Sequence, residues 1–192
     1  MEIGESGESG ESGESSTGVR LVPWSDEDGG LLRAVNAPEL MGHLGGPESE
    51  EQLVVRQRRY VELSAAADRP GCMFRVEVLP EGRPAGSVGF WESSWEGEPV
   101  YETGWTVLPG FQGRGVATAA TLAVIERARA EGRFRSLFAF PSTDNAPSNA
   151  VCRKAGFTLL GERDYEYPPG HPLRCNAWRL DLEQGRVPTA GA

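Results

Sequence analysis

Hydrophobic and polar positions alternate along much of this chain, a pattern typical of strands that pack one face of a sheet. Two alternating runs, 72–79 and 84–91, flank the turn sequence PEGR and predict a β-hairpin. The other segments that predict strands are 19–24, 99–108, 136–140, 157–167 and 173–182. Together they predict one mostly antiparallel sheet.

Helical signals come directly after the first predicted strand. Short helical pieces are predicted from Ser25, a candidate N-cap, to the paired glycines at 45–46. A longer helix is predicted at 47–67. It has Pro47 and acidic residues in its first turn and arginines later, as the helix dipole favours.

Two further helices are predicted in the second half of the chain. One runs from a glycine-rich loop to Gly132, and the other, at 146–155, is ended by Gly156. The residues expected on the apolar face of the first are Val116, Ala119, Ala120, Leu122, Ala123 and Ile125. The order of elements predicts a single α/β (α+β) domain, in which a mixed, mostly antiparallel central sheet is flanked by helices.

The two ends of the chain differ from this domain in composition. Residues 4–15 are four copies of Gly-Glu-Ser, which have no apolar side chain to bury, so we expect 1–18 to be a disordered leader. The domain is expected at 19–183 and a short tail at 184–192. The leader carries five of the glutamates and no basic residue, so the rest of the chain has a net charge of −4 out of −9.

Composition and charge narrow the class of protein. A net negative domain disfavours nucleic acid as a partner, and no apolar run approaches the ~20 residues of a membrane span. Three cysteines form no spaced framework, which favours a reducing cytoplasm. His43 and His171 have no ligand spacing to a Cys or acidic cluster, so no metal is expected. Arginine greatly outnumbers lysine, which suggests a GC-rich, bacterial coding sequence.

The loop at 112–117, QGRGVA, carries the clearest chemical signal. A dinucleotide-binding G-x-G-x-x-G/A motif would need Gly or Ala at position 118, where this chain has Thr118. The loop also lacks the Gly-Lys-Ser/Thr of a P-loop, so neither common nucleotide-binding motif fits. Gly113 and Gly115 at a helix N-terminus still favour binding of a phosphate on backbone amides, and Arg114 adds a positive charge. A tight turn without a ligand is the alternative that the loop alone leaves open.

Two motifs resemble those of the GNAT superfamily of N-acetyltransferases. The loop at 112–117 has the form Q-x-x-G-x-A, which is similar to the superfamily's pyrophosphate-binding Q/R-x-x-G-x-G/A. The segment NAPSNAVCRKAGF at 145–157 resembles its second signature, an Asn followed by a helix that ends in K-x-G-F. LMGHLGGPESEEQL at 40–53 and PPGHPLRCNAWRLDL at 168–182 resemble the ribosomal-protein N-terminal acetyltransferase-like branch. The resemblance covers roughly 19–183 and implies a single GNAT-like domain.

The resemblance implies that acetyl-CoA is the co-substrate and indicates which residues bind it. The strand before the loop would pair its backbone with the pantetheine arm, and Asn145 would touch that arm, although an N-cap explains Asn145 equally well. The full set of residues expected to bind acetyl-CoA is Trp105, Thr106, Val107, Gln112, Gly113, Arg114, Gly115, Val116, Ala117, Asn145 and Lys154. Trp105 and Val107 could instead have only a core role.

The expected catalytic residues also follow from the resemblance. Glu102 lies on the strand before the loop, where the superfamily often has a general base; a solvated strand glutamate is the alternative. Many members have a tyrosine that protonates the departing CoA thiolate seven residues after the Asn, but here that position is Cys152. Ser148 is the branch's candidate for this acid, and Cys152 is a weaker one because a buried Cys usually only packs.

An acceptor-binding region is expected around the end of the 84–91 strand. Trp24, Trp91 and Trp95 could wall a pocket, and core packing is an equally good interpretation. Glutamates there could form an acidic mouth that attracts a cationic amine. The acidic residues in question are Glu92, Glu96 and Glu98, of which we expect Glu92 and Glu96, with Trp91 and Trp95, to bind substrate.

The sequence therefore predicts a cytoplasmic, acetyl-CoA-dependent N-acetyltransferase. Its expected acceptor is the primary amine of a small molecule, such as an antibiotic or a polyamine, which attacks the thioester directly in a ternary complex. A protein N-terminus as acceptor and a non-catalytic acyl-CoA-binding regulatory module are the alternatives. No nucleic-acid or membrane partner is expected, and a homodimer is left open.

Overall fold

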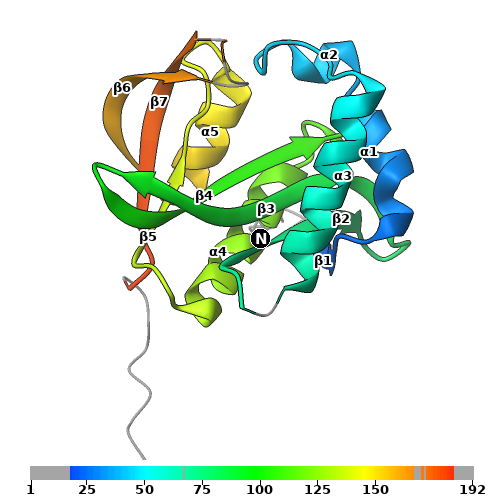
Figure 1. The fold of residues 1–192 in the computed structure, drawn as a ribbon, viewed down its shortest axis with the longest axis horizontal. Coiled ribbons are helices and arrows are strands. Elements are labelled where there is room, and N and C mark those ends of the chain that lie inside the picture. Colours follow the sequence, from blue (N-terminus) through cyan, green and yellow to red (C-terminus); the bar gives the residue numbers. More distant parts are fainter. Residues whose placement is uncertain (1–17, 67, 167–169, 171, 184–192) are drawn as a thin grey trace, which may run out of the picture.

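The structure is a computed structural model of the 192-residue chain, and it describes residues 18–66, 68–166, 170 and 172–183 (Figure 1). The predicted leader lies outside the described residues except for Gly18, and so do the predicted tail and His171. Within the described part of the chain, the predicted alternation of strands and helices is confirmed.

Seven strands form one sheet in the order β1-β2-β3-β4-β5-β7-β6. Each neighbouring pair is antiparallel except β4 and β5, which are parallel, so the predicted mixed, mostly antiparallel sheet is confirmed. The strands are β1 (Val19–Pro23), β2 (Gly71–Val78), β3 (Arg83–Trp95), β4 (Glu98–Val107), β5 (Ser136–Ala139), β6 (Thr158–Glu166) and β7 (Pro172–Asp181).

Helices cover both faces of this sheet (Figure 1). The short helices that follow β1 and the long α3 pack on the face that carries Met73 and Trp91, whereas α4 and α5 pack on the face that carries Phe74 and Phe90. The helices are the 3-10 turn η1 (Asp26–Asp28), α1 (Gly29–Val35), α2 (Pro38–Met41), α3 (Glu50–Ala65), the 3-10 turn η2 (Pro109–Phe111), α4 (Val116–Glu131) and α5 (Ala146–Lys154). No described helix combines the length and the apolar character that crossing a membrane requires.

The start of α3 corrects a predicted boundary. The helix was expected from Pro47 but begins at Glu50, because Ser49 is its N-cap. Ser49 Oγ accepts a hydrogen bond from Gln52 N at 3.3 Å, and Gln52 Oε1 accepts one from Ser49 N at 2.8 Å. This reciprocal capping box satisfies two amides at the helix end and leaves Pro47 in the preceding loop.

The packing of α4 corrects the predicted apolar face. Val116, Ala120, Val124 and Ala128 form the buried stripe, spaced four residues apart. Leu122 was expected to be buried but is 46% exposed. It lies two residues from Val124, which is about 200° round a helix, so it cannot share the face of that stripe. Of the stripe predicted at Ala119, Leu122 and Ile125, Ile125 is buried and Ala119 half-buried, so the correction concerns Leu122 alone.

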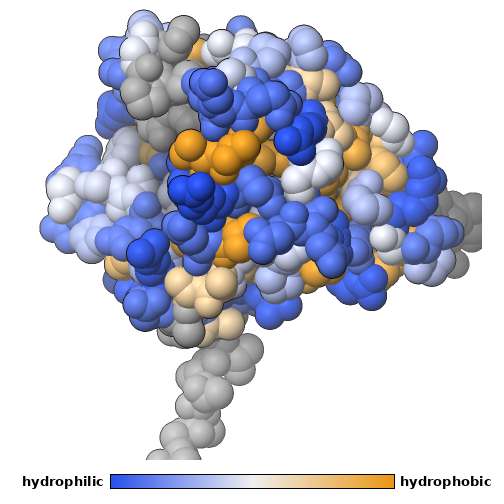
Figure 2. Space-filling model, turned by 45° about the vertical axis from the view of Figure 1, so that its right-hand side comes forward, coloured by the Kyte–Doolittle hydropathy of each residue, from blue (hydrophilic) through white to orange (hydrophobic). Residues whose placement is uncertain are grey.

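The molecular surface is mostly hydrophilic and has only small hydrophobic patches on the side shown in Figure 2. The most exposed large apolar side chains are Val55 at 66% and Val54 at 53%, both on α3. Others are Leu79 after β2, Leu122 on α4, and Leu159 and Leu160, both on β6. Scattered apolar residues of this kind are ordinary on a globular surface.

Candidate active site

The loop that links β4 to α4 has the backbone conformation that its glycines predict. Gly113 and Gly115 have φ values of +72° and +77°, in the left-handed region that residues with a side chain rarely adopt. A β-carbon at Gly113 would have open space around it. The loop therefore needs glycine there for its conformation, and it leaves room beside the backbone.

The N-terminus of α4 is suited to bind an anion. Gly115 is the N-cap and supplies no side-chain hydrogen bond, so the amides of the first turn are not capped by it. Residues 112–115 are exposed, and the helix dipole places partial positive charge at this end. Val116 is buried in the core and Ala117 is half-buried, so these two residues can offer a ligand mainly their backbone amides.

Gln112 holds the loop against the strand before it. Its Nε2 donates a hydrogen bond to the carbonyl of Val107 at 2.9 Å. The side chain thus connects the end of β4 to the turn that leads into α4. The Gln112 side chain therefore stabilises the shape of the loop, whereas the sequence led us to expect that it contacts the cofactor directly.

The parallel strands β4 and β5 pair over only two positions. Tyr101 pairs with Leu137 and Glu102 with Phe138, whereas β4 continues to Val107 alongside β3. The backbone of β4 at 103–107 is therefore not paired with β5. The two strands separate before the loop that leads to α4. The three residues expected to line this opening are placed differently: Trp105 and Val107 pack toward α4, and Thr106 is half-buried on the other face.

Helix α5 follows β5 in the chain and contacts α4. Asn145 is the N-cap, and its Oδ1 accepts a hydrogen bond from Ser148 N at 3.1 Å, so its capping role is confirmed. Ser148 is half-buried. Lys154 is exposed in the last turn, at the other end of the helix.

Cys152 faces the core on this helix. Its side chain is fully buried in the main hydrophobic cluster, and burial raises the pKa of its thiol to about 12. A thiol held protonated so strongly is a poor proton donor at neutral pH. The packing role that the sequence allowed for Cys152 is the one that the surroundings favour.

Asn149 is a buried polar residue that the sequence analysis missed. It is only 5% exposed, and its amide makes four hydrogen bonds. Nδ2 donates to the carbonyls of Ser142 and Asn145, both at 2.9 Å. Oδ1 accepts from Asn176 Nδ2 at 2.8 Å and Trp178 Nε1 at 2.9 Å. Asn149 thereby fixes the turn before α5 to β7. Its spacing of four from Asn145 was the only signal in the sequence.

Glu102 projects from β4 on the face opposite α4. Its neighbour Tyr101 packs in the α4 cluster, so alternation turns Glu102 to the other side. The carboxylate is half-buried and accepts a hydrogen bond from Ser93 Oγ at 2.9 Å. Burial raises the pKa of the Cys175 thiol to about 11, with further contributions from Asp144 and Glu102. Cys175 also forms a β-bridge with Ser142, two residues before Asp144.

This geometry is that of an acetyltransferase fold, and comparison with known proteins bears it out. The family model of the acetyltransferase (GNAT) domain matches residues 19–158. The chain belongs to this family. The superfamily and fold predicted from the motifs are thereby confirmed.

Relatives of this GNAT chain differ in what they act on. A mycothiol acetyltransferase of Saccharomonospora viridis is 34% identical over 167 residues, 80% of this chain and 50% of that protein. The chain spans about half the length of the curated relatives it matches. The Salmonella typhimurium enzyme that modifies the N-terminal serine of ribosomal protein L7/L12 has a TM-score of 0.69 at 21% identity, over 88% of this chain and 96% of that one.

A second solved structure extends this range. The spermidine N-acetyltransferase of Vibrio cholerae, solved with CoA and spermine, has a TM-score of 0.67 at 15% identity, over 85% of this chain and 95% of that one. At such identities, likeness to the solved structures shows the shared fold alone. The class of acceptor therefore has to be argued from the residues of this chain.

The tryptophans expected at the acceptor side of this GNAT fold have different surroundings. Trp24 is only 3% exposed, and its Nε1 donates to Gln57 Oε1 on α3 at 2.9 Å, so it is a core residue and not a pocket wall. Trp91 lies over Gly104, on the same face as Glu102. Trp95 is stacked on Phe138 of β5, with ring centroids 4.7 Å apart.

The glutamates expected at an acidic mouth divide between the two faces of the sheet. Glu92 pairs with Tyr101, so its side chain lies on the face opposite Glu102 and cannot join that residue at an acceptor site. Glu96 is exposed at the tip of the β3–β4 hairpin, with a φ of +52°. Its Oε1 lies 4.0 Å from Arg163 Nη2 of β6.

His43 has a partner that the sequence did not indicate. Its Nδ1 lies 3.2 Å from Asp144 Oδ1, although the two residues are 101 positions apart. The contact joins the segment after α2 to the turn before α5. Within the described part of the chain, no three His, Cys, Asp or Glu side chains come together as a metal site would require.

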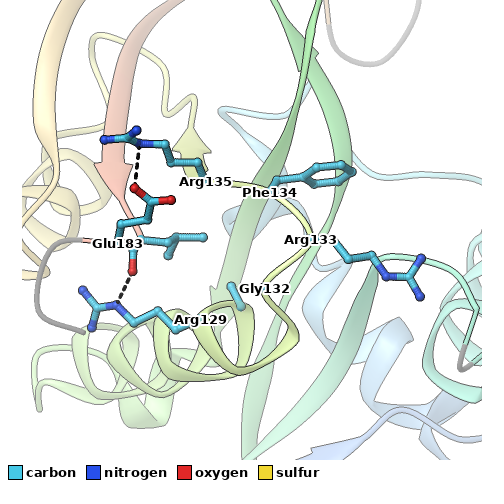
Figure 3. Close-up of a pocket in the computed structure, with 8 residues that line it drawn as sticks. Arg129, Gly132, Arg133, Phe134, Arg135 and Glu183 are labelled. Atoms are coloured by element: carbon cyan, nitrogen blue, oxygen red, sulfur yellow. Dashed lines mark hydrogen bonds and ion pairs between the residues drawn. The ribbon is translucent and has the colours of Figure 1, made fainter. Parts of the chain in front are cut away.

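A hollow of about 190 Å³ lies far from this site, at the C-terminal end of α4 (Figure 3). Two of its cations are engaged: Arg129 Nε donates to the Leu182 carbonyl at 3.3 Å, and Arg135 Nε lies 3.3 Å from Glu183 Oε2. A helix of this length spans about 24 Å, which separates the hollow from the glycine loop. These arginines connect α4 and β5 to the end of β7.

Proposed function

We propose that the chain is an acetyl-CoA-dependent N-acetyltransferase that acts on the primary amine of a small molecule. The observation that carries the proposal is the position of the anion-binding end of α4, directly after the stretch where β4 parts from β5. A pyrophosphate bound at that loop would direct the rest of acetyl-CoA along β4 toward Glu102. The mycothiol acetyltransferase, which is 34% identical to this chain, supports a small acceptor.

The residues of this chain suit the chemistry of acetyl-CoA. Amides at 113–117 would hold the pyrophosphate, together with Arg114. The unpaired edge of β4 at 105–107 would bind the pantetheine arm through its backbone, and its amides would polarise the thioester carbonyl. Asn145 would contact the arm while it caps α5, and exposed Lys154 would reach a more distant phosphate.

Glu102 would act as the general base. The amine is protonated at neutral pH, with an ordinary pKa near ~10, and only its neutral form attacks a carbonyl. As the nitrogen–carbon bond forms and the carbon–sulfur bond breaks, the amine proton would pass to Glu102, directly or through water. Ser148 would give the departing thiolate its proton and take one back from solvent, to which Glu102 returns the amine proton. Trp91 and Trp95 share the face of Glu102 and would bound the acceptor.

The decisive experiment is a panel of amines incubated with acetyl-CoA and followed by release of the CoA thiol. Turnover of small amines, but not of peptides with a free N-terminus, supports the proposal. Turnover of peptides alone would point to the alternative that the ribosomal-protein acetyltransferase suggests. Stabilisation by CoA without any turnover would indicate a regulatory CoA-binding module. The three free cysteines are consistent with the cytoplasm as the proposed location.

A further inference from the structure

Arg163 lies over an aromatic platform beside the proposed acceptor site. Its guanidinium carbon is 5.3 Å from the centroid of the Trp95 ring. Trp95 is itself stacked on Phe138 and Phe140, with centroid distances of 4.7 Å and 5.9 Å and near-parallel planes. The hairpin tip that carries Trp95 therefore crosses β5 and reaches β6 (Figure 1). A guanidinium held in this way is oriented before any ligand arrives.

The cation is on the same face of the sheet as Glu102. Trp95 pairs with Glu98, and Glu102 follows four residues later on β4, so alternation puts all three side chains on one face. Across the sheet, Glu102 pairs with Phe138 and Phe138 with Arg179. Cys175 lies on the same face of β7 as Arg179 and pairs with Arg163. The pairs between β3 and β4, and the pairs that lead across the sheet to β6, thus both place Arg163 on the face that carries Glu102.

Within the described part of the chain, the guanidinium of Arg163 makes no hydrogen bond to an acidic side chain. Its nearest acidic partner there is Glu96, at 4.0 Å, which is too long for a hydrogen bond. Arg174 on the same hairpin differs, because it binds Glu162 at 3.1 Å and Asp164 at 2.7 Å. The two arginines are equally exposed, at 50% and 52%. A guanidinium has five N–H donors in a fork that matches a carboxylate.

We infer that Arg163 is a carboxylate-binding subsite, and that the preferred acceptor carries a carboxylate at the end opposite its amine. The inference rests on the proposed acetyl transfer at Glu102. Negative charge at Glu102 and Asp144 suits the ammonium end of such a molecule, and Arg163 suits the other end. A diamine fits less well, because its second ammonium would meet Arg163.

The strand geometry sets the length of this acceptor. Four residues of β4 separate the level of Trp95 from Glu102, which is about 13 Å along a strand. β6 is also three strands away from β4, about 14 Å across the sheet, so the two backbones are about 19 Å apart. The side chains of Arg163 and Glu102 both reach into that interval, so the amine and the carboxylate should lie on the order of 10 Å apart. An extended chain of eight carbons has roughly that length.

Three acceptors of equal length test the inference: octylamine, its analogue with a terminal carboxylate and its analogue with a second terminal amine. With the wild-type protein, we expect kcat/KM to be about tenfold higher for the carboxylate than for octylamine, as a charged hydrogen bond at a half-exposed site allows. The diamine should be the poorest of the three. Arg163→Gln should remove the preference, and Arg174→Gln, the matched control, should retain it.

Several results would overturn the inference, and they can be told apart from failure of the proposed function. If octylamine is acetylated but the carboxylate gives no advantage, the transfer activity stands and the subsite is wrong. The same follows if Arg163→Gln keeps the preference. Lack of turnover with all three while acetyl-CoA still binds would overturn both. If Arg163→Gln unfolds, loss of the wild-type preference at high salt tests the same charge pair.

Discussion

Trp178 Nε1 donates a hydrogen bond to Asn149 Oδ1 at 2.9 Å, and both side chains are buried. The bond joins α5 to β7, while the other end of the Asn149 amide holds the carbonyls of Ser142 and Asn145. The turn that carries Asn145 is therefore positioned by a residue that need not touch any substrate.

Asn149→Asp should therefore affect both stability and cofactor binding. The change keeps the shape but removes both donors and buries a charge, at a cost of about 1–3 kcal/mol for each polar group left unpaired. Urea unfolding should show a loss of about 3 kcal/mol or more, and KM for acetyl-CoA should rise. Asn176→Ala removes only one of the four bonds and should cost less. An equal loss in both variants would contradict the positioning role.

Glu102→Gln should slow the chemical step. If Glu102 is the base, kcat near pH 7 should fall by about 10²–10⁴-fold with little change in KM for acetyl-CoA. The deficit should shrink at higher pH, because more of the amine is already neutral. Glu92→Gln is the control, since that side chain lies on the opposite face. A rise in acceptor KM at constant kcat would make Glu102 an ammonium-binding residue instead.

Gly115→Glu should abolish stabilisation by acetyl-CoA. It places a negative charge at the end of α4 where the pyrophosphate would bind, in a residue with a φ of +77°. Gly115→Ala separates strain from charge: it should cost about 1–2 kcal/mol of stability, as a left-handed residue with a side chain does, yet keep most of the ligand-induced rise in Tm. An undiminished rise in the Glu variant would remove the loop from the site.

The stabilisation that Asp144 gains from Ser142 and His43 should be lost at low pH. The hydrogen bond from Ser142 Oγ is the largest cause that lowers the Asp144 pKa below its ordinary 3.8, and His43 adds to it. A lowered folded-state pKa means that the contribution to stability is present above the ordinary pKa and is lost as pH falls through the lower value. Asp144→Asn should therefore be less stable than wild type at neutral pH.

The same variant gives a second measurement for Asp144. The difference in Tm between wild type and Asp144→Asn should vanish in acid, below the titration of the carboxyl group. Ser142→Ala should move the pKa of Asp144, followed by NMR, back toward its ordinary value. A Tm difference that persists unchanged into acid would show that the carboxylate charge is irrelevant to the turn.

The sequence determined the features of this protein that depend on near neighbours in the chain. Alternation predicted the strands, and Gly113 and Gly115 predicted a loop at a helix N-terminus where a ligand could approach the backbone. The N-cap role of Asn145 was one of the two interpretations that its residue type and position allowed. These features are local, because a strand's period, a turn's φ and a helix cap are set within a few residues.

Tertiary structure decided the features that join distant segments. Glu92 and Glu102 look alike in sequence, but the register of β3 with β4 puts them on opposite faces. The contacts of His43 with Asp144 and of Trp95 with Arg163 also appear only once the strands are ordered in the sheet. A one-residue change of register would turn each strand's side chains to the other face, so no local pattern specifies which charges meet.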